Sequence, residues 1–475
     1  MDISLAERLG SADRGDLLAR IARFVRANSR LIAGGLLFPN LLSLLTLTSL
    51  VDIGLPPRTE SILFYACVAL IARPLRFVFV VPLFLAVLAF DLVRTLALMF
   101  GMAPSEFLAA FEHAQRVDLF ASPLYVALTA AIVATTIASL VCLSSRKALV
   151  AANAPAFFGL TLAFAAVDFA CNVSPHYHLG WMVGRSEQVQ SAAEVSGFGA
   201  AAGEGRRDVV LVMVESLGYL RDPAARARIA APLRDPGLAK DYVVTSGQTT
   251  YFGSTTSGEM RELCGTRMFY KDYVAQDADR CLPDRLAQRG YATVAVHGFV
   301  GGMFERHQWY PTIGFDRSLF GAELIKTTGR VCGDSFRGAC DADLAPLLAA
   351  AQPADAGNAP RFVYWLTLNS HVPVAPDQAR TNFACGHDGG PFGQTDVCRM
   401  AELWHDVFNV VAQLARDPAL RRPEILIVGD HAPPLWSKRG RAQFEPGQVA
   451  WYRLQPRGEP QPRMRIREAG VGTLQ

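Results

Sequence analysis

A run of small hydroxyl residues and glycines, SGQTTYFGSTTSGEMRELCG at Ser246–Gly265, has residue types that suit catalysis. Residues 253–258 predict a turn-rich entry to a helix, with Glu259 in its first turn. Backbone N–H groups at such a helix start suit a phosphate. A hydroxyl there is a poor nucleophile unless a base or a metal ion removes its proton. The run is therefore either a solvated Ser/Thr loop or part of a site, depending on whether the chain supplies a metal.

Chemically capable side chains also follow several predicted strands. Apolar runs that predict buried parallel strands lie at 209–215, 291–298, 361–371 and 424–431. The residues that close these runs are Glu215, His297, His371, Asp430 and His431. In an open α/β sheet, ligands bind beyond the carboxyl ends of the strands. A single Glu or His at the end of a strand is usually just a surface residue, but four such strand ends in one domain favour a functional site.

A metal site follows from three of these residues and one hydroxyl. Glu215, Asp430 and His431 offer two carboxylates and an imidazole, which suit one divalent metal ion, zinc or manganese. Thr255 is predicted as the fourth ligand, so that the metal would lower the pKa of its hydroxyl and prepare it for in-line attack.

Three further residues are predicted to bind substrate. His297 and His371 would bind or protonate phosphate oxygens and the leaving group. Arg306 is the candidate guanidinium for neutralising the charge that develops during the reaction.

Composition divides the chain into a membrane part and a soluble part. Apolar residues make up 51% of the 475 residues, and nearly all long uncharged runs precede residue 174. The formal net charge is only +3 without a long basic run, which disfavours a nucleic-acid partner. We expect a cytoplasmic segment at 1–30, an α-helical membrane domain at 31–173, an interfacial segment and flexible linker at 174–207, and an α/β domain with a mostly parallel central sheet at 208–475.

Five membrane spans are predicted from length and apolar character. They are Leu31–Val51, Ile62–Ala72, Phe77–Phe90, Ala121–Leu143 and Leu149–Val173. Basic residues at the N-terminus, at 73–76 and at 146–147 then face the cytoplasm, which places the soluble part outside. If residues 62–90 formed one hairpin element, four spans would place the soluble part in the cytosol instead.

Two details of the membrane part are also predicted. Asp91 and Arg94 are spaced to pair at i, i+3 if the third span continues towards Gly101. Pro104–Arg116, between the third and fourth spans, is predicted as a short amphipathic helix on the outer surface.

Six cysteines follow the membrane part and favour the five-span topology. They are Cys264, Cys281, Cys332, Cys340, Cys385 and Cys398. The short spacings CGDSFRGAC and CGHDGGPFGQTDVC predict disulfide loops in an oxidising compartment. Zinc binding is the alternative, but the chain contains no CxxC motif.

Residues 208–455 resemble the alkaline phosphatase/sulfatase superfamily. They are most similar to its membrane-bound branch of lipoteichoic acid synthases, phosphoglycerol transferases and phosphoethanolamine transferases. The matching motifs are VMVES at 212–216, Thr255 four residues before Glu259 and nine before Cys264-Gly265, His297-Gly298 followed by Arg306, TLNSH at 367–371, and GDH at 429–431. VGDHAPPLW lacks the continuation typical of either lipoteichoic acid or phosphoethanolamine enzymes.

The resemblance implies roles for these residues. Glu215, Thr255, Asp430 and His431 would be metal ligands, with Thr255 as the nucleophile. Rival nucleophiles in the same run are Ser254, Thr256 and Ser257.

Cys264-Gly-Thr-Arg267 superficially resembles the modified cysteine motif of sulfatases. That motif requires a proline two residues after the cysteine, where this chain has Thr266. Sulfate ester hydrolysis is therefore disfavoured, and Cys264 is better explained as the partner of Cys281.

The expected protein is an enzyme of the bacterial inner membrane with its catalytic domain in the periplasm. Thr255 would attack the head-group phosphate of a phospholipid donor, with phosphatidylglycerol as the favoured donor. A glycan or glycolipid would then accept the group from a phosphothreonine. Alternatives are phosphoethanolamine transfer to lipid A or another glycan, a membrane-anchored phosphodiesterase, and an inactive metal-binding scaffold.

Overall fold

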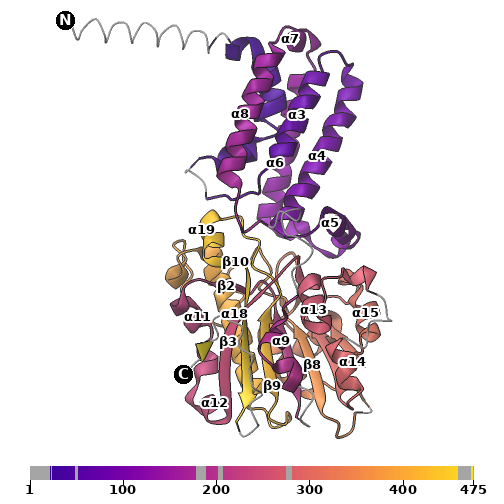
Figure 1. The fold of residues 1–475 in the computed structure, drawn as a ribbon, viewed down its shortest axis with the longest axis vertical. Coiled ribbons are helices and arrows are strands. Elements are labelled where there is room, and N and C mark those ends of the chain that lie inside the picture. The colour runs from indigo at the N-terminus through magenta and orange to yellow at the C-terminus, as the bar shows by residue number, and fades with distance from the viewer. Residues whose placement is uncertain are drawn as a thin grey trace, which may run out of the picture. The chain divides into compact units, whose positions relative to one another are not determined.

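The computed structural model describes residues 22, 24–48, 52–177, 189–201, 207–273, 281–354, 356–457 and 472–473 (Figure 1). The chain divides into two compact units. The first comprises Met1–Leu96 and Pro123–Ser174, and the second comprises Ala97–Ser122 and Pro175–Gln475. Residues 97–122, expected within the membrane domain, therefore fold with the soluble part of the chain.

The first unit contains three helices that are long and apolar enough to cross a membrane. They are α4 (Phe77–Met99), α6 (Pro123–Leu143) and α8 (Ala154–Asn172). Its shorter helices are α2 (Leu41–Thr46), α3 (Thr59–Ile71) and α7 (Arg146–Val150). Fewer spans than the expected five thus meet the length criterion within the described residues.

The predicted span Leu31–Val51 is interrupted. Residues 24–32 are helical, the π-helix η1 (Ala33–Leu37) follows, and a turn separates it from α2. Pro39 stands in this turn, where its missing N–H and its ring oppose a continuous helix. The Asn40 side-chain amide donates to the Leu36 carbonyl oxygen at 2.9 Å and satisfies one of the freed carbonyls.

The predicted ion pair between Asp91 and Arg94 is wrong. Asp91 instead accepts from the buried guanidinium of Arg58, with one contact at 3.0 Å. Arg94 pairs with Glu60 at 2.6 Å. The backbone N–H of Arg58 also donates to Asp168 at 2.8 Å, so residues distant in sequence satisfy these buried charges better than the helical neighbour does.

The second unit is built on a nine-stranded mixed sheet in the order β11-β3-β10-β9-β1-β8-β4-β5, with β2 paired to β10. The four central strands predicted from sequence, β1, β4, β8 and β9, are parallel to one another. The strands are β1 (Val209–Val214), β2 (Gly218–Leu220), β3 (Tyr242–Thr250), β4 (Ala292–His297), β5 (Arg317–Phe320), β8 (Arg361–Leu366), β9 (Glu424–Gly429), β10 (Phe444–Pro456) and β11 (Gly472–Thr473). A separate hairpin pairs β6 (Val331–Cys332) with β7 (Gly338–Ala339).

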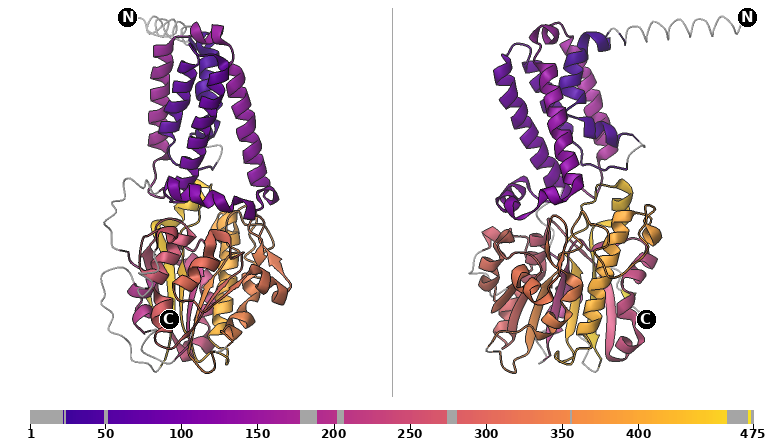
Figure 2. Two further views of the ribbon diagram at one scale, coloured as in Figure 1. Left: turned by 90° about the vertical axis from the view of Figure 1, so that its right-hand side faces the viewer. Right: turned by 180° about the vertical axis from the view of Figure 1, so that it is seen from behind.

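Helices cover both faces of this sheet (Figure 2). One core layer contains the even-numbered residues of β1, together with α11 (Pro223–Ile229), α12 (Pro236–Asp241), α17 (Ala345–Ala350) and α18 (Thr395–Leu414). The other contains the odd-numbered residues of β1 with α13 (Thr255–Cys264), α14 (Leu282–Ala287) and α15 (Arg306–Thr312). Because β1 is buried on both faces, its sequence is a continuous apolar run.

Residues 189–201, expected within a flexible linker, pack onto the second core layer. They include the short helices α9 (Ala192–Val195) and α10 (Phe198–Ala201), and the side chain of Phe198 is fully buried. The N–H groups of Ala192 and Ala193 each donate to the Glu262 carboxylate at 3.0 Å. The rest of the expected interfacial segment, at 178–188, lies outside the described residues.

All six cysteines of the second unit form disulfides, as predicted. The pairs are Cys264–Cys281, Cys332–Cys340 and Cys385–Cys398.

Candidate active site

The parallel register of β1 and β9 brings the candidate metal ligands together. Val214 and Gly429 are paired at the carboxyl ends of these strands. The next residues, Glu215 and Asp430, therefore emerge side by side at the same sheet edge. Local sequence thus provides two buried strands, and their pairing makes the acids neighbours.

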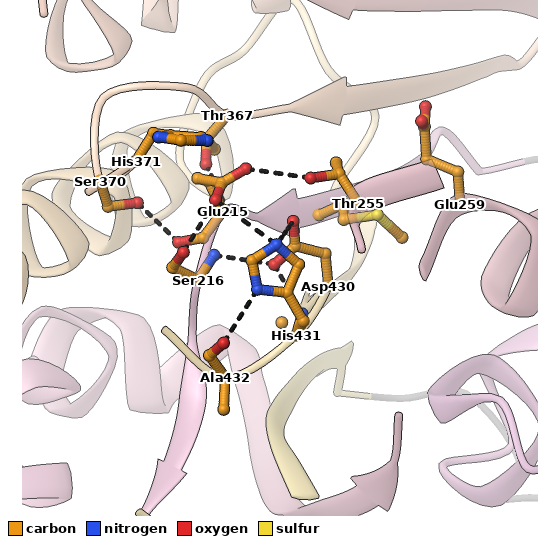
Figure 3. Close-up of polar contacts among 12 residues, drawn as sticks. Glu215, Ser216, Thr255, Glu259, Thr367, Ser370, His371, Asp430, His431 and Ala432 are labelled. Atoms are coloured by element: carbon orange, nitrogen blue, oxygen red, sulfur yellow. Dashed lines mark hydrogen bonds and ion pairs between the residues drawn. The ribbon is translucent and has the colours of Figure 1, made fainter. Parts of the chain in front are cut away.

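Glu215, Asp430 and His431 form a buried cluster whose ligand atoms all lie within 4.8 Å of one another (Figure 3). His431 Nε2 lies 3.6 Å from Glu215 Oε1 and 3.4 Å from Asp430 Oδ2. His431 Nδ1 lies 3.0 Å from the Ala432 carbonyl oxygen, so Nδ1 carries the donated hydrogen and Nε2 faces the carboxylates. This tautomer is the one a metal ion at Nε2 requires.

The donor set fits a divalent metal ion. Asp430 Oδ1 accepts the N–H groups of Ser216 and His431, each at 2.7 Å, whereas the buried Oδ2 has no hydrogen-bond partner among the described residues. Burial, and then the nearby Glu215 charge, raise the pKa of Asp430 to about 7. Burial alone would lower the pKa of His431, but the two carboxylates raise it. A cation between these groups would compensate the repulsion and give Oδ2 a partner.

The backbone at Ser216 is held in an uncommon conformation, with a φ of 59°. This conformation directs its N–H to Asp430, while its hydroxyl donates to Glu215 Oε1 at 2.8 Å. Non-glycine residues with positive φ occur most often where the surrounding contacts require them. Ser216 therefore positions both acids, a role that sequence analysis assigned to no residue although VMVES contains it.

Thr255 is the first residue of α13, and its hydroxyl donates to Glu215 Oε2 at 3.3 Å. The helix approaches the cluster closely at Gly258, where a Cβ would lie 2.9 Å from Asp430 Cα. The helix begins earlier than expected, so Glu259 lies in its second turn instead of its first. The structure thus brings Thr255 to the predicted metal ligands.

The loop after β8 supports Glu215 from behind. Thr367 Oγ1 accepts the Glu215 N–H at 2.9 Å, and the Ser370 hydroxyl donates to the Glu215 carbonyl oxygen at 2.6 Å. The indole of Trp404 donates to the same carbonyl at 3.1 Å. Asp341 in turn accepts two N–H groups of this loop. The TLNSH motif contained Thr367 and Ser370, whereas no sequence signal singled out Trp404 or Asp341.

His371 ends this loop and lies beside the cluster of Glu215, Asp430 and His431 (Figure 3). Its Nδ1 lies 2.8 Å from the Val372 carbonyl oxygen, and its ring centroid lies 3.8 Å from that of Phe336. Burial, together with the charge of His431, lowers the pKa of His371 to about 4. The imidazole is therefore neutral at neutral pH.

His297 closes β4 and is also buried. Its Nδ1 lies 3.1 Å from the Leu366 carbonyl oxygen. Burial, and then the charge of Arg306, lower its pKa to about 3. His297 is therefore a neutral imidazole next to a cation.

Arg306 does not present a free cation. Its guanidinium donates to the Glu259 carboxylate, with Nη2 at 2.9 Å from Oε2, and both side chains are buried. Tyr310 also donates to Glu259, at 2.5 Å, and Tyr364 does so at 3.3 Å. In Figure 3, Glu259 points away from the cluster of Glu215, Asp430 and His431. The predicted anion-binding role of Arg306 would require a substrate to compete with this carboxylate.

A family model described as Sulfatase matches residues 207–453, just over half of the chain. The comparison with curated protein sequences gave no match.

Several solved structures are similar to the chain. The lipoteichoic acid synthase LtaP from Listeria monocytogenes has 17% identity and a TM-score of 0.41, covering 58% of this chain and 70% of its own. The Streptococcus pyogenes phosphoglycerol transferase GacH, in complex with sn-glycerol-1-phosphate, has 14% identity and a TM-score of 0.38, with 57% and 78% coverage. The periplasmic domain of EptC from Escherichia coli, in complex with Zn, has 15% identity and a TM-score of 0.35, with 54% and 74% coverage. Because these identities and TM-scores are low, only the family model assigns the chain to a family.

Proposed function

We propose that this chain, which belongs to the sulfatase family, transfers a phosphoryl head group from a membrane phospholipid to an envelope glycan or glycolipid. The observation that carries the proposal is the hydroxyl of Thr255, hydrogen-bonded to Glu215 within the cluster of Asp430 and His431. The three helices of membrane length support a lipid donor.

The residues of the chain have distinct parts in this proposal. Glu215, Asp430, His431 and Thr255 would hold one divalent ion, zinc or manganese. When bound, that ion supplies positive charge that lowers the pKa of the Thr255 hydroxyl and compensates charge on the phosphate. Glu215 Oε2 orients the hydroxyl by accepting its hydrogen bond.

The reaction would have two in-line steps. Thr255 Oγ1 forms a bond to phosphorus while the bond from phosphorus to the diacylglycerol oxygen breaks, and the proton released by the Thr255 hydroxyl passes to that oxygen, so diacylglycerol leaves as an alcohol. An acceptor hydroxyl then forms a bond to phosphorus while the bond to Thr255 breaks, and the acceptor's proton returns to Thr255 Oγ1. His371 and His297, both neutral, can accept hydrogen bonds from hydroxyl groups of the donor or acceptor in these steps. Arg306 would contact phosphate only by sharing its guanidinium with Glu259.

Phosphatidylglycerol is the favoured donor because TLNSH at 367–371 is similar to the phosphoglycerol-transferring members. Phosphoethanolamine transfer and hydrolysis are the competing outcomes. The bacterial inner membrane, with the catalytic domain in the periplasm, is the proposed location, and the three disulfides of the second unit support it.

The test is incubation of the purified full chain with phosphatidylglycerol or phosphatidylethanolamine labelled in the head group, with zinc or manganese supplied. We expect diacylglycerol release and label on a peptide containing Thr255. Thr255→Ala should lose the label, whereas the matched variant Thr256→Ala should keep it. Label on another residue would refute the assignment of the nucleophile. Free glycerol phosphate without transfer to added glycan would show a hydrolase.

A further inference from the structure

Residues 97–122, the interspan segment, join two helices of membrane length yet belong to the compact unit of the catalytic sheet. The segment contains α5 (Pro104–Ala110), η2 (Phe111–Arg116) and η3 (Leu119–Ala121). With α4 and α6 as membrane spans, chain continuity would confine the segment to one membrane surface. The catalytic unit would then carry an element that is tied covalently to that surface at both ends.

Several groups of the interspan segment contact the rest of the second unit. Glu112 accepts from Lys271 Nζ at 2.6 Å, and the His113 ring lies edge-on to Phe304 with centroids 5.4 Å apart. The backbone N–H of Asp118 donates to the Ser335 carbonyl oxygen at 3.0 Å. These contacts hold the segment against the rest of the unit, with the Glu112 side chain itself 61% exposed.

The apolar residues of the same segment are exposed. They form what we call the apolar ridge: Leu108 (53% exposed), Phe111 (55%), Leu119 (49%) and Phe120 (87%). In a helix that faces water, by contrast, the apolar stripe packs on the core. Leaving large apolar side chains in water is unfavourable compared with burying them in an apolar medium. The ridge therefore suits a medium other than water, and the spans on either side supply one.

The interspan segment is also connected to the active site. Val117 packs against the buried cluster of Phe299, Met303 and Leu368. Phe336 packs on the same cluster, and its ring lies against His371. Packed side chains thus lead from the segment to the His371 side of the site.

We propose that the apolar ridge inserts into the lipid interface and holds the His371 side of the active site at the depth of phospholipid head groups. The inference rests on the proposed function for its substrate. Membrane insertion of the ridge can be measured without any activity.

The first experiment measures the surroundings of Phe120. The full chain carries Cys67→Ala, Cys142→Ala and Cys171→Ala, with an environment-sensitive fluorophore on Phe120→Cys, in vesicles of phosphatidylglycerol and phosphatidylcholine. We expect blue-shifted emission that is quenched by head-group-spin-labelled lipid and protected from aqueous iodide. A matched probe on Lys240→Cys, exposed in α12, should be quenched by iodide alone. The proposal would be overturned if iodide quenched the Phe120→Cys probe as readily as the Lys240→Cys probe. It would also be overturned if neither iodide nor spin-labelled lipid quenched the Phe120→Cys probe because protein covers it.

The second experiment measures whether the apolar ridge favours turnover of a lipid substrate over a soluble one. Phe111→Asp with Phe120→Asp should lower the ratio of phosphatidylglycerol turnover in vesicles to bis(p-nitrophenyl) phosphate turnover about tenfold, because two apolar anchors are lost. The control, Phe111→Leu with Phe120→Leu, should keep the ratio near that of the unsubstituted chain. An unchanged ratio in the aspartate variant would overturn the proposal. If the unsubstituted chain turns over neither phosphatidylglycerol nor phosphatidylethanolamine while spin-labelled lipid quenches the Phe120→Cys probe, the proposed function fails and the insertion of the ridge stands.

Discussion

Arg306 and Glu259 show how the surroundings of one residue change what its type implies. The sequence indicates a guanidinium ready for phosphate, but in the fold its charge meets the buried Glu259 carboxylate. Two tyrosine hydroxyls complete the hydrogen bonds of that carboxylate. Since Glu259 lies four residues after Thr255 on one helix face, its ion pair with Arg306 also anchors the helix that carries the proposed nucleophile.

Asp341 gives the sharpest prediction for a single residue. Its carboxylate accepts the N–H groups of Leu368 and Asn369 at 2.9 and 2.7 Å. Burial nevertheless raises its pKa to about 7. The stability gained from this group is full below its unfolded pKa, near 4, and is lost as the pH rises through 7.

Asp341→Asn should therefore flatten the fall of the unfolding free energy between pH 4 and 7. The slope removed should be on the order of 1 kcal/mol per pH unit, because the amide mimics the protonated acid. Chemical denaturation across this pH range measures the slope. Asp343→Asn, in the same segment, is the control. An equal slope in Asp341→Asn and the unsubstituted chain would contradict the raised pKa.

The close contact between α13 and the carboxyl end of β9 fixes the position of Thr255 relative to Asp430. Gly258→Ala would place a Cβ 2.9 Å from Asp430 Cα and Cβ, and backbone cannot yield as a flexible side chain can. Helix α13 must shift, and Thr255 shifts with it. We expect phosphoenzyme formation to fall about a hundredfold, since such displacements are costly to catalysis.

Gly265→Ala is the matched control for this variant. It ends the same helix with a φ of 63° and open space around its Cβ position. Its strain should cost on the order of 1 kcal/mol of stability without displacing Thr255. Rapid-quench measurement of phosphothreonine separates the two effects. Equal activity losses in both variants would show that stability alone is responsible.

The elements that could be predicted are those whose pattern of apolar residues lies within one short stretch of sequence. Strand β1 is a continuous apolar run, and the side chains that follow such runs meet once parallel pairing is assumed. Residues 189–201 resembled a linker because they are small and polar, and only the Glu262 carboxylate and the buried Phe198 reveal why they fold. Their stability comes from tertiary contacts that composition does not encode. The same holds for Asp91, whose partner Arg58 lies on another segment.

The first unit has two chemically different ends. At one, Arg73 donates to the Leu149 carbonyl oxygen at 3.0 Å and Arg146 donates to the Arg73 carbonyl oxygen at 3.1 Å, so the two basic turns meet. The other holds the ion pair of Arg58 and Asp91 with Asp168 nearby. Basic turns favour the cytoplasmic side, so the second unit should be periplasmic.

Cysteine labelling in intact spheroplasts checks this orientation. With the three free cysteines replaced by alanine, Lys240→Cys in the catalytic unit should react with a membrane-impermeant maleimide. Lys147→Cys, exposed at the basic turn, should react only after lysis. The opposite pattern would place the six disulfide cysteines in a reducing compartment, where such bonds rarely persist. It would also separate Thr255 from any periplasmic glycan, because acceptor and nucleophile would then face different sides of the membrane.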